Sequence, residues 1–221
     1  MTDRIVERCR EKTGGESGAA LLLALTTAAL LSAIAASLIV ATSVDMMIAG
    51  NHRASVETIY AVEAGVERAI AELARVADWS AVLAPAPSNA VASFDDRSAR
   101  ATTPDGGILS VPLLTAARQE ISDTVYGPAR FGADRPVWQL YAHAPLQGIL
   151  PPGIIAPPGY VLVWVADDGG DGDGDPARDG NGQVLLHGDG YGLGGGRRSI
   201  EVAIARAAPA GVRVLSWKEQ R

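Results

Sequence analysis

The longest apolar stretch of the chain lies close to its N-terminus. Residues 17–44 carry no charged side chain, and residues 19–44 contain neither glycine nor proline. An α-helix needs about 20 apolar residues to cross the roughly 30 Å hydrocarbon core of a bilayer. The pattern therefore predicts one membrane-spanning helix over residues 19–44.

Apolar positions continue at helical spacing over residues 45–79. They recur every three or four residues and form one stripe, which comprises Ile48, Val56, Ile59, Tyr60, Val62, Val66, Ile70, Leu73 and Val76. The residues expected on the opposite, polar side are Glu63, Glu67, Arg68 and Glu72. An isolated glycine such as Gly50 costs only about 1 kcal/mol in a helix. We therefore expect one long helix over residues 19–79 that ends near Trp79, with its second half packed on a globular domain.

The remainder of the chain divides into a connector and a β-rich part. Residues 80–135 are rich in turn signals and predict loops, with one short strand starting at Ile108. Residues 136–221 contain five candidate strands, at 137–144, 160–166, 182–188, 199–205 and 212–217. The separators are glycine-rich and too short for crossover helices, which favours antiparallel hairpins. The predicted fold class is α+β, with a long helix packed on a C-terminal antiparallel sheet.

The composition agrees with an apolar segment joined to an acidic domain. The 221 residues are 48% hydrophobic and 20% charged, with a net charge of −6. An acidic chain is a poor partner for nucleic acid, which requires clustered Lys and Arg. Its one cysteine, Cys9, excludes an intramolecular disulfide and a cysteine-based zinc cluster.

Nothing in the sequence predicts an active site or a small-molecule substrate. His143 and His187 lie in candidate strands and are expected to be structural, and no Ser-His-Asp or Cys-His arrangement is evident. Residues 190–195 fit the pattern G-x-G-x-x-G, but they link two candidate strands. Without a helix N-terminus the pattern makes no phosphate site and predicts a hairpin loop. The chain is therefore not expected to be an enzyme.

The loop over residues 167–181 carries the one candidate metal site. Its aspartates include four at the first, third, fifth and ninth positions of a calcium-loop spacing: Asp171, Asp173, Asp175 and Asp179. Pro176 and Gly182 replace the glycine and glutamate of an EF-hand, and strands replace its helices. Two interpretations stay open, a Ca²⁺ site with Asp167, Asp168 and Asn181 as further ligands, or a solvated acidic hairpin loop.

The N-terminal third of the chain, residues 14–79, resembles type IV pilins and, more closely, the PilX-type minor pilins. The resemblance rests on three segments, which are Glu16-Ser-Gly-Ala-Ala-Leu-Leu-Leu-Ala-Leu, Met46-Met-Ile-Ala-Gly-Asn-His-Arg and Tyr60-Ala-Val-Glu-Ala-Gly-Val-Glu-Arg-Ala. The last segment is also similar to GspK-type pseudopilins of type II secretion.

This resemblance implies a leader over residues 1–18 that a prepilin peptidase removes after Gly18. Ala19 would then be the methylated N-terminus of the mature chain. Leu23 stands at the fifth mature position, where major pilins carry Glu, and this departure suggests a priming or tip subunit. The residues that the resemblance assigns to helix packing in the filament are Leu23, Tyr60, Glu63 and Gly65.

The expected function is that of a minor pilin-like structural subunit in pilus assembly. Basic residues of the leader place the N-terminus in the cytoplasm. The β domain would lie in the periplasm, on a single inner-membrane span, and later on the pilus or cell surface. Expected partners are other minor and major pilins, the prepilin peptidase and the inner-membrane assembly platform. The alternatives are a GspK-like pseudopilin and a Sec-exported periplasmic binding module cleaved near Ala35.

Overall fold

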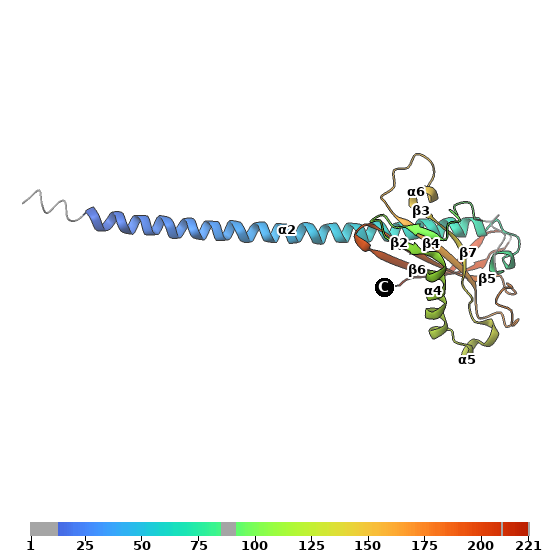
Figure 1. Cartoon of the computed structure of the whole chain (residues 1–221). Helices are drawn as coiled ribbons and strands as arrows, with labels where there is room; N and C mark the ends of the chain where they lie inside the picture. The colour runs from blue at the N-terminus through green and yellow to red at the C-terminus, as the bar shows by residue number, and fades with distance from the viewer. Residues whose placement is uncertain (1–12, 85–91, 209, 221) are drawn as a thin grey trace, which may run out of the picture. The chain divides into compact units, whose positions relative to one another are not determined.

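The computed structural model describes residues 13–84, 92–208 and 210–220, apart from the side chains of residues 13–17 and 128. Its α+β fold confirms the predicted class, because a long N-terminal helix packs on a five-stranded antiparallel sheet (Figure 1). The helices are α2 (Thr13–Leu73), α3 (Ser80–Leu83), α4 (Val111–Val125), α5 (Pro128–Phe131), η1 (Gly132–Asp134), α6 (Leu146–Ile149) and η2 (Leu193–Gly195). The strands are β1 (Arg100–Thr102), β2 (Ile108–Ser110), β3 (Gln139–Pro145), β4 (Tyr160–Asp167), β5 (Gln183–Tyr191), β6 (Arg197–Arg206) and β7 (Val212–Gln220).

Helix α2 runs without interruption through Gly50, as the sequence predicts, but its end was predicted wrongly. The helix ends at Leu73 rather than near Trp79. Beyond Leu73 the chain turns back, and Trp79 donates a hydrogen bond from its indole nitrogen to the Leu73 carbonyl oxygen at 2.9 Å. The fully buried indole thereby adds a second hydrogen bond to a carbonyl that also accepts one from the Val76 backbone amide at 3.1 Å. At its other end the helix begins at Thr13, inside the predicted leader.

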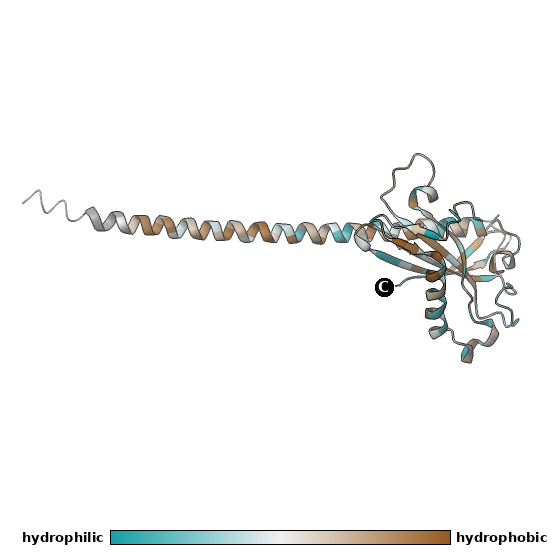
Figure 2. Cartoon of the chain, viewed as in Figure 1, coloured by the Kyte–Doolittle hydropathy of each residue, from teal (hydrophilic) through white to brown (hydrophobic). Residues whose placement is uncertain are grey.

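The chain divides into two compact units, Met1–Gly50 and Asn51–Arg221. In the first unit, every residue of α2 whose side chain is described, from Gly18 onward, is exposed. This part of α2 is long and apolar enough to cross a membrane (Figure 2). The described residues of 19–44 thus have the length and composition that the sequence predicts for a span.

In the second unit the five predicted strands form one sheet in the order β3-β4-β5-β6-β7. Each strand pairs antiparallel with the next one along the chain, and the connection between β3 and β4 contains the short helix α6. The two faces of the sheet are both covered. Val161, Val163 and Val165 of β4 belong to the core under α2, whereas Leu162 and Trp164 belong to a second core with the start of α4.

The second half of α2 packs on the sheet through a stripe that overlaps the predicted one, since Val62, Val66 and Leu73 are buried and Ile59, Ile70 and Val76 pack against the core. Its buried residues are Thr58, Ala61, Val62, Gly65, Val66, Ala69, Glu72 and Leu73. Tyr60, placed by the sequence in the apolar stripe, is 64% exposed. Glu72, placed on the polar side, is buried, because Arg68, Ser93 and Tyr141 supply hydrogen bonds to its carboxylate.

The segment 80–135 contains more regular structure than expected. The predicted strand at Ile108 is confirmed as β2, which pairs with β1, but the prediction of loops misses the 15-residue helix α4. The described apolar residues of α4 lie largely on its solvent side, as at Leu113, Ile121 and Val125, while Arg118 and Ser122 are buried. A helix that buries its polar residues does not show the usual amphipathic pattern.

Candidate functional site

The predicted processing site lies on an open stretch of α2. A side chain at Gly18 would meet no atom within 4 Å among the described residues, and Ala19 is exposed. Leu23 is 66% exposed. No described residue covers the side chains of this segment, so they are accessible to the surroundings of the helix.

Hydroxyl groups of the apolar segment bond back to the helix itself. Thr26 and Thr27 donate to carbonyl oxygens three and four residues earlier at 2.9–3.0 Å, and Thr42 does the same. Ser37 donates to Ile34, and Ser43 to Ile39. Such intrahelical bonds satisfy hydroxyl donors where no water is present. These residues therefore suit a lipid environment despite their polar side chains.

Glycines allow α2 to approach the sheet closely. A Cβ atom at Gly65 would lie 2.6 Å from Cγ1 of Val161, and one at Gly188 would lie 2.6 Å from Cγ2 of Val66. Gly190 and Gly192 face α2 in the same way, because added side chains there would meet Val62 and Thr58. Gly190 belongs to β5, which corrects the prediction that the hairpin loop begins there.

The other predicted helix-packing residues lie in different surroundings. Gly65 is buried within the helix–sheet contact, Tyr60 is exposed, and Glu63 is partly buried. Burial and the negative charges of Glu67 and Glu219 raise the pKa of Glu63. Among these residues, only Leu23 and Tyr60 have large exposed side chains available to another subunit.

A charged network fills the space between α4 and the sheet. Arg118 donates to the Glu201 carboxylate at 2.9 Å, and both side chains are buried. Gln220 donates to the same carboxylate oxygen at 2.9 Å, and the Arg118 guanidinium lies 4.8 Å from the ring centroid of Trp138. Burial lowers the pKa of Arg118, while Glu201 opposes that shift. The network connects α4 to β6 and β7 and was missed in the sequence.

Both strand histidines are buried. His187 lies 3.1 Å from the Asp189 carboxylate, which also accepts hydrogen bonds from Arg197 and Ser199. Burial lowers the pKa of His187, so its neutral form is favoured. Burial alone would raise the pKa of Asp189, but these partners hold it at about 2. His143 contacts the hydroxyl of Tyr160 at 2.6 Å, and that hydroxyl donates to Asp96.

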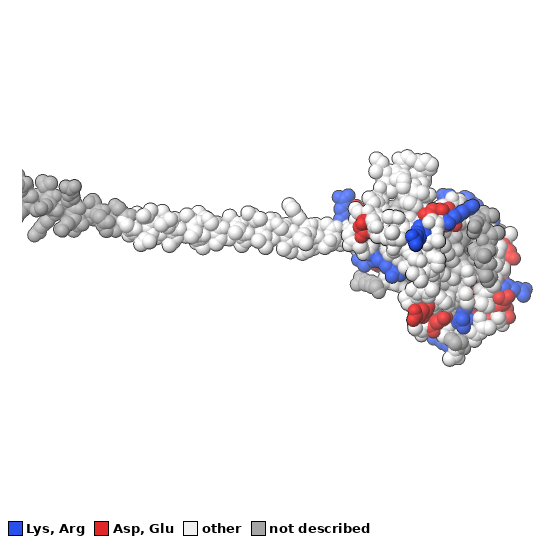
Figure 3. All heavy atoms as spheres, viewed as in Figure 1, with Lys and Arg blue, Asp and Glu red and all other residues white. Residues whose placement is uncertain are grey.

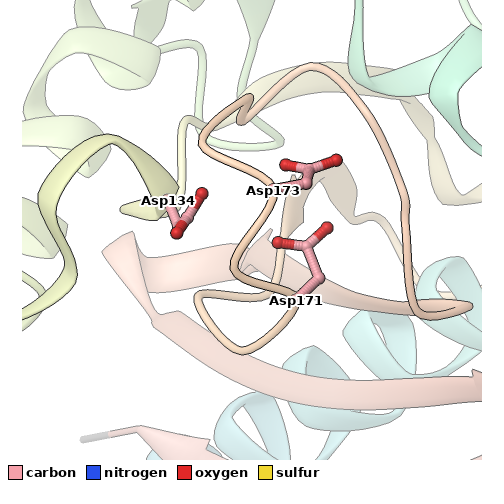
Figure 4. Close-up of side chains that lie close together, drawn as sticks. All are labelled: Asp134, Asp171 and Asp173. Carbon is pink, nitrogen blue, oxygen red and sulfur yellow. The ribbon is translucent and has the colours of Figure 1, made fainter.

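The aspartate loop folds back on itself at the end of β4. Gly172 and Gly174 alternate with its aspartates and have φ of +70° and +79°, a conformation that glycine adopts without steric cost. The structure brings Asp171 and Asp173 together with Asp134 of η1, and one ligand atom from each lies within 4.8 Å of the others (Figure 4). Asp134 was not predicted, and nothing in its sequence surroundings marks it.

The other two predicted ligands, Asp175 and Asp179, do not belong to this group. Asp179 accepts hydrogen bonds from the backbone of Gly182 and Gln183 and lies 3.8 Å from Arg206. Asp175 accepts one from the backbone of Ala177. Both carboxylates therefore accept hydrogen bonds from the loop backbone and lie outside the group of three.

Asp167 lies at the base of the loop and is 1% exposed. Neither of its carboxylate oxygens has a hydrogen-bond partner among the described residues. Burial, followed by the charges of Asp171 and Asp168, raises its pKa to about 8. A carboxyl group in this position favours the protonated form unless a cation is close by.

Charged side chains are unevenly distributed over the described chain. Figure 3 shows acidic and basic side chains mixed over the surface of the globular unit, and none along the apolar stretch of α2.

No protein family, curated protein or solved structure matches the chain in comparisons with known proteins. Its function is therefore inferred from its own residues and their geometry.

Proposed function

We propose that the chain is a minor pilin-like structural subunit of a type IV pilus. Residues 1–18 would be the leader, residues 19–44 the membrane anchor, and the sheet unit the part that lies in the periplasm. After removal of the leader, the same apolar segment would pack among the helices of other pilins in the filament. The sheet unit would then be displayed on the pilus at the cell surface.

The observation that carries this proposal is the exposed apolar surface of a helix that continues into a folded domain. Leu22, Leu31 and Ile39 are each about two-thirds exposed, and the side chains around them are similarly uncovered. Apolar surface of this extent requires cover by lipid or by other helices. A pilin subunit needs a helix that can leave the lipid bilayer and pack against the helices of other subunits, and an apolar helix of this kind can do both.

Leu23 supports a position at the tip or at the start of the filament. In major pilins the Glu at this position would have to be neutralised within the apolar filament core, where a charge is costly. Leu23 has no charge to neutralise, so it requires no contact with an N-terminal amine of a neighbouring subunit. GspK-type pseudopilins also lack this Glu. Association of the chain with components of a secretion system, and not with pilins, would identify it as a GspK-like pseudopilin.

The only cysteine of the chain makes the processing step measurable. Cys9 lies in the leader, outside the described residues. When the chain is co-expressed with a prepilin peptidase, we expect it to lose 18 residues and with them all reaction with a maleimide. Without the peptidase we expect full-length chain in the membrane that reacts with the maleimide.

Two valine variants control this experiment, because a Cβ atom added at Gly18 or Gly50 would meet no other part of the described structure within 4 Å. Gly18→Val is expected to keep its leader and its maleimide label, whereas Gly50→Val is cleaved like the unmodified chain. Cleavage near Ala35 that is independent of the peptidase would instead identify a Sec-exported protein and contradict the proposal.

A further inference from the structure

Asp134, Asp171 and Asp173 come from two segments that are far apart in the sequence. One ligand atom of each lies within 4.8 Å of the others, and their carboxylates lie close together in Figure 4. Ca²⁺ binds oxygen at about 2.3–2.6 Å, so two of its ligands can be up to about 5 Å apart. All three carboxylates can therefore reach one ion without rearrangement of the backbone.

Each of the three carboxylates is held by a backbone amide of the loop. Gly174 donates to Oδ1 of Asp134 at 2.5 Å, Gly180 to Oδ2 of Asp171 at 3.1 Å, and Asp175 to Oδ1 of Asp173 at 2.9 Å. The second oxygen of each carboxylate takes no part in these bonds. Three fixed side chains thus retain one oxygen each for a ligand.

Asp167 is an independent sign that a cation belongs here. Its carboxylate is buried, and neither oxygen has a hydrogen-bond partner in the described part of the chain. Two residues after Asp167, a Cβ atom at Gly169 would lie 3.1 Å from the backbone oxygen of Asp134, so this end of the loop lies against η1. Oδ1 of Asp171 is itself buried and without a described hydrogen-bond partner. Buried carboxylate oxygens without donors are rare in folded proteins and require a compensating charge.

We propose that Asp134, Asp171 and Asp173 bind one Ca²⁺ ion, with Asp167 as a buried carboxylate at the base of the same loop. The donors are oxygen atoms only, which selects a hard cation over zinc or copper. Ca²⁺ tolerates irregular coordination and accepts water and loop carbonyls as further ligands, whereas Mg²⁺ demands a regular octahedron. The bound ion would connect the aspartate loop to η1. The proposed Ca²⁺ site does not depend on the proposed pilin-like function.

The test uses the full-length protein in detergent, freed of metal with EGTA and titrated with CaCl₂ in a calorimeter. We expect one Ca²⁺ per chain and a higher melting temperature in its presence. Asp134→Asn and Asp171→Asn should each weaken binding at least ~10-fold, as typically follows changes around a metal ion. Asp175→Asn is the matched control, since it removes the same charge from the same loop, and should leave the affinity unchanged.

Asp167→Asn provides a second test, which measures the thermal stability of the folded protein. In EGTA this variant should melt at a higher temperature than the unmodified chain, because it removes an uncompensated buried carboxylate. Addition of CaCl₂ should raise the melting temperature of this variant by less than it raises that of the unmodified chain. No Ca²⁺ binding by the unmodified chain, equal weakening by Asp175→Asn, or equally tight binding of Mg²⁺ would each overturn the proposal.

Discussion

Replacement of Glu201 by glutamine is expected to destabilise the protein by about 3–5 kcal/mol, because it removes one partner of a buried ion pair. Arg118 of α4 would stay buried against the sheet, with its guanidinium 2.9 Å from an uncharged amide in place of a carboxylate. In a domain of this size, such a loss lowers the melting temperature by about 10 °C. Thermal unfolding of the full-length chain in detergent, followed by circular dichroism, measures the effect.

Two further variants test whether the cost comes from the unpaired buried charge. Glu57→Gln breaks an exposed pair, Arg53–Glu57 on α2, and should leave the melting temperature unchanged. The double variant Arg118→Met with Glu201→Leu should be far more stable than Glu201→Gln, because no buried charge is left without a partner. If Glu201→Gln is as harmless as Glu57→Gln, the described network does not connect α4 to the sheet.

Replacement of Gly65 by alanine is expected to destabilise the sheet unit by about 1–3 kcal/mol, the usual cost of overpacking a core. The added Cβ would lie 2.6 Å from Cγ1 of Val161, so α2 and β4 would have to move apart. The direction is informative, since alanine normally stabilises a helix by up to about 1 kcal/mol relative to glycine. Chemical denaturation with urea gives the free energy of unfolding.

Gly50→Ala is the matched control, because it makes the same change in the same helix where no described atom lies within 4 Å. It should leave the free energy of unfolding unchanged or raise it slightly. Val161→Ala removes the atom that the new Cβ would meet, so the double variant with Gly65→Ala should lose less than the sum of the single changes. Stabilisation by Gly65→Ala would contradict the close contact between α2 and the sheet.

The predicted fold was correct wherever one local rule determined the outcome. Period-two alternation, as at Ile200, Val202 and Ile204, predicted strand β6 correctly even though Glu201 on its other face is buried too, and glycine-rich separators specify hairpins. The uncharged run over residues 19–44 predicts a continuous helix for the same reason. The end of α2 escaped prediction because the helical spacing of apolar residues continues to Val76, whereas the helix ends at Leu73 and the chain beyond it buries Trp79.

The candidate sites were less predictable because they depend on long-range packing. Asp171 and Asp173 are close in sequence and were both predicted as ligands, but Asp134 joins them only because η1 lies against the loop, where a Cβ atom at Gly169 would meet Phe131. In the sequence, Arg118 has the character of a surface residue. Only the folded structure shows that it pairs with Glu201. Polar residues that are buried in pairs carry no signal in a hydrophobic pattern.

The N-terminal residue of the mature chain tests the central claim most directly. The chain should be purified from the membranes or surface filaments of cells that make it, and its intact mass and N-terminal peptide determined by mass spectrometry. A pilin-like subunit starts at Ala19 with a methylated amine and lacks the 18 leader residues. A mature chain that starts at Met1, or near Ala36, would contradict the account.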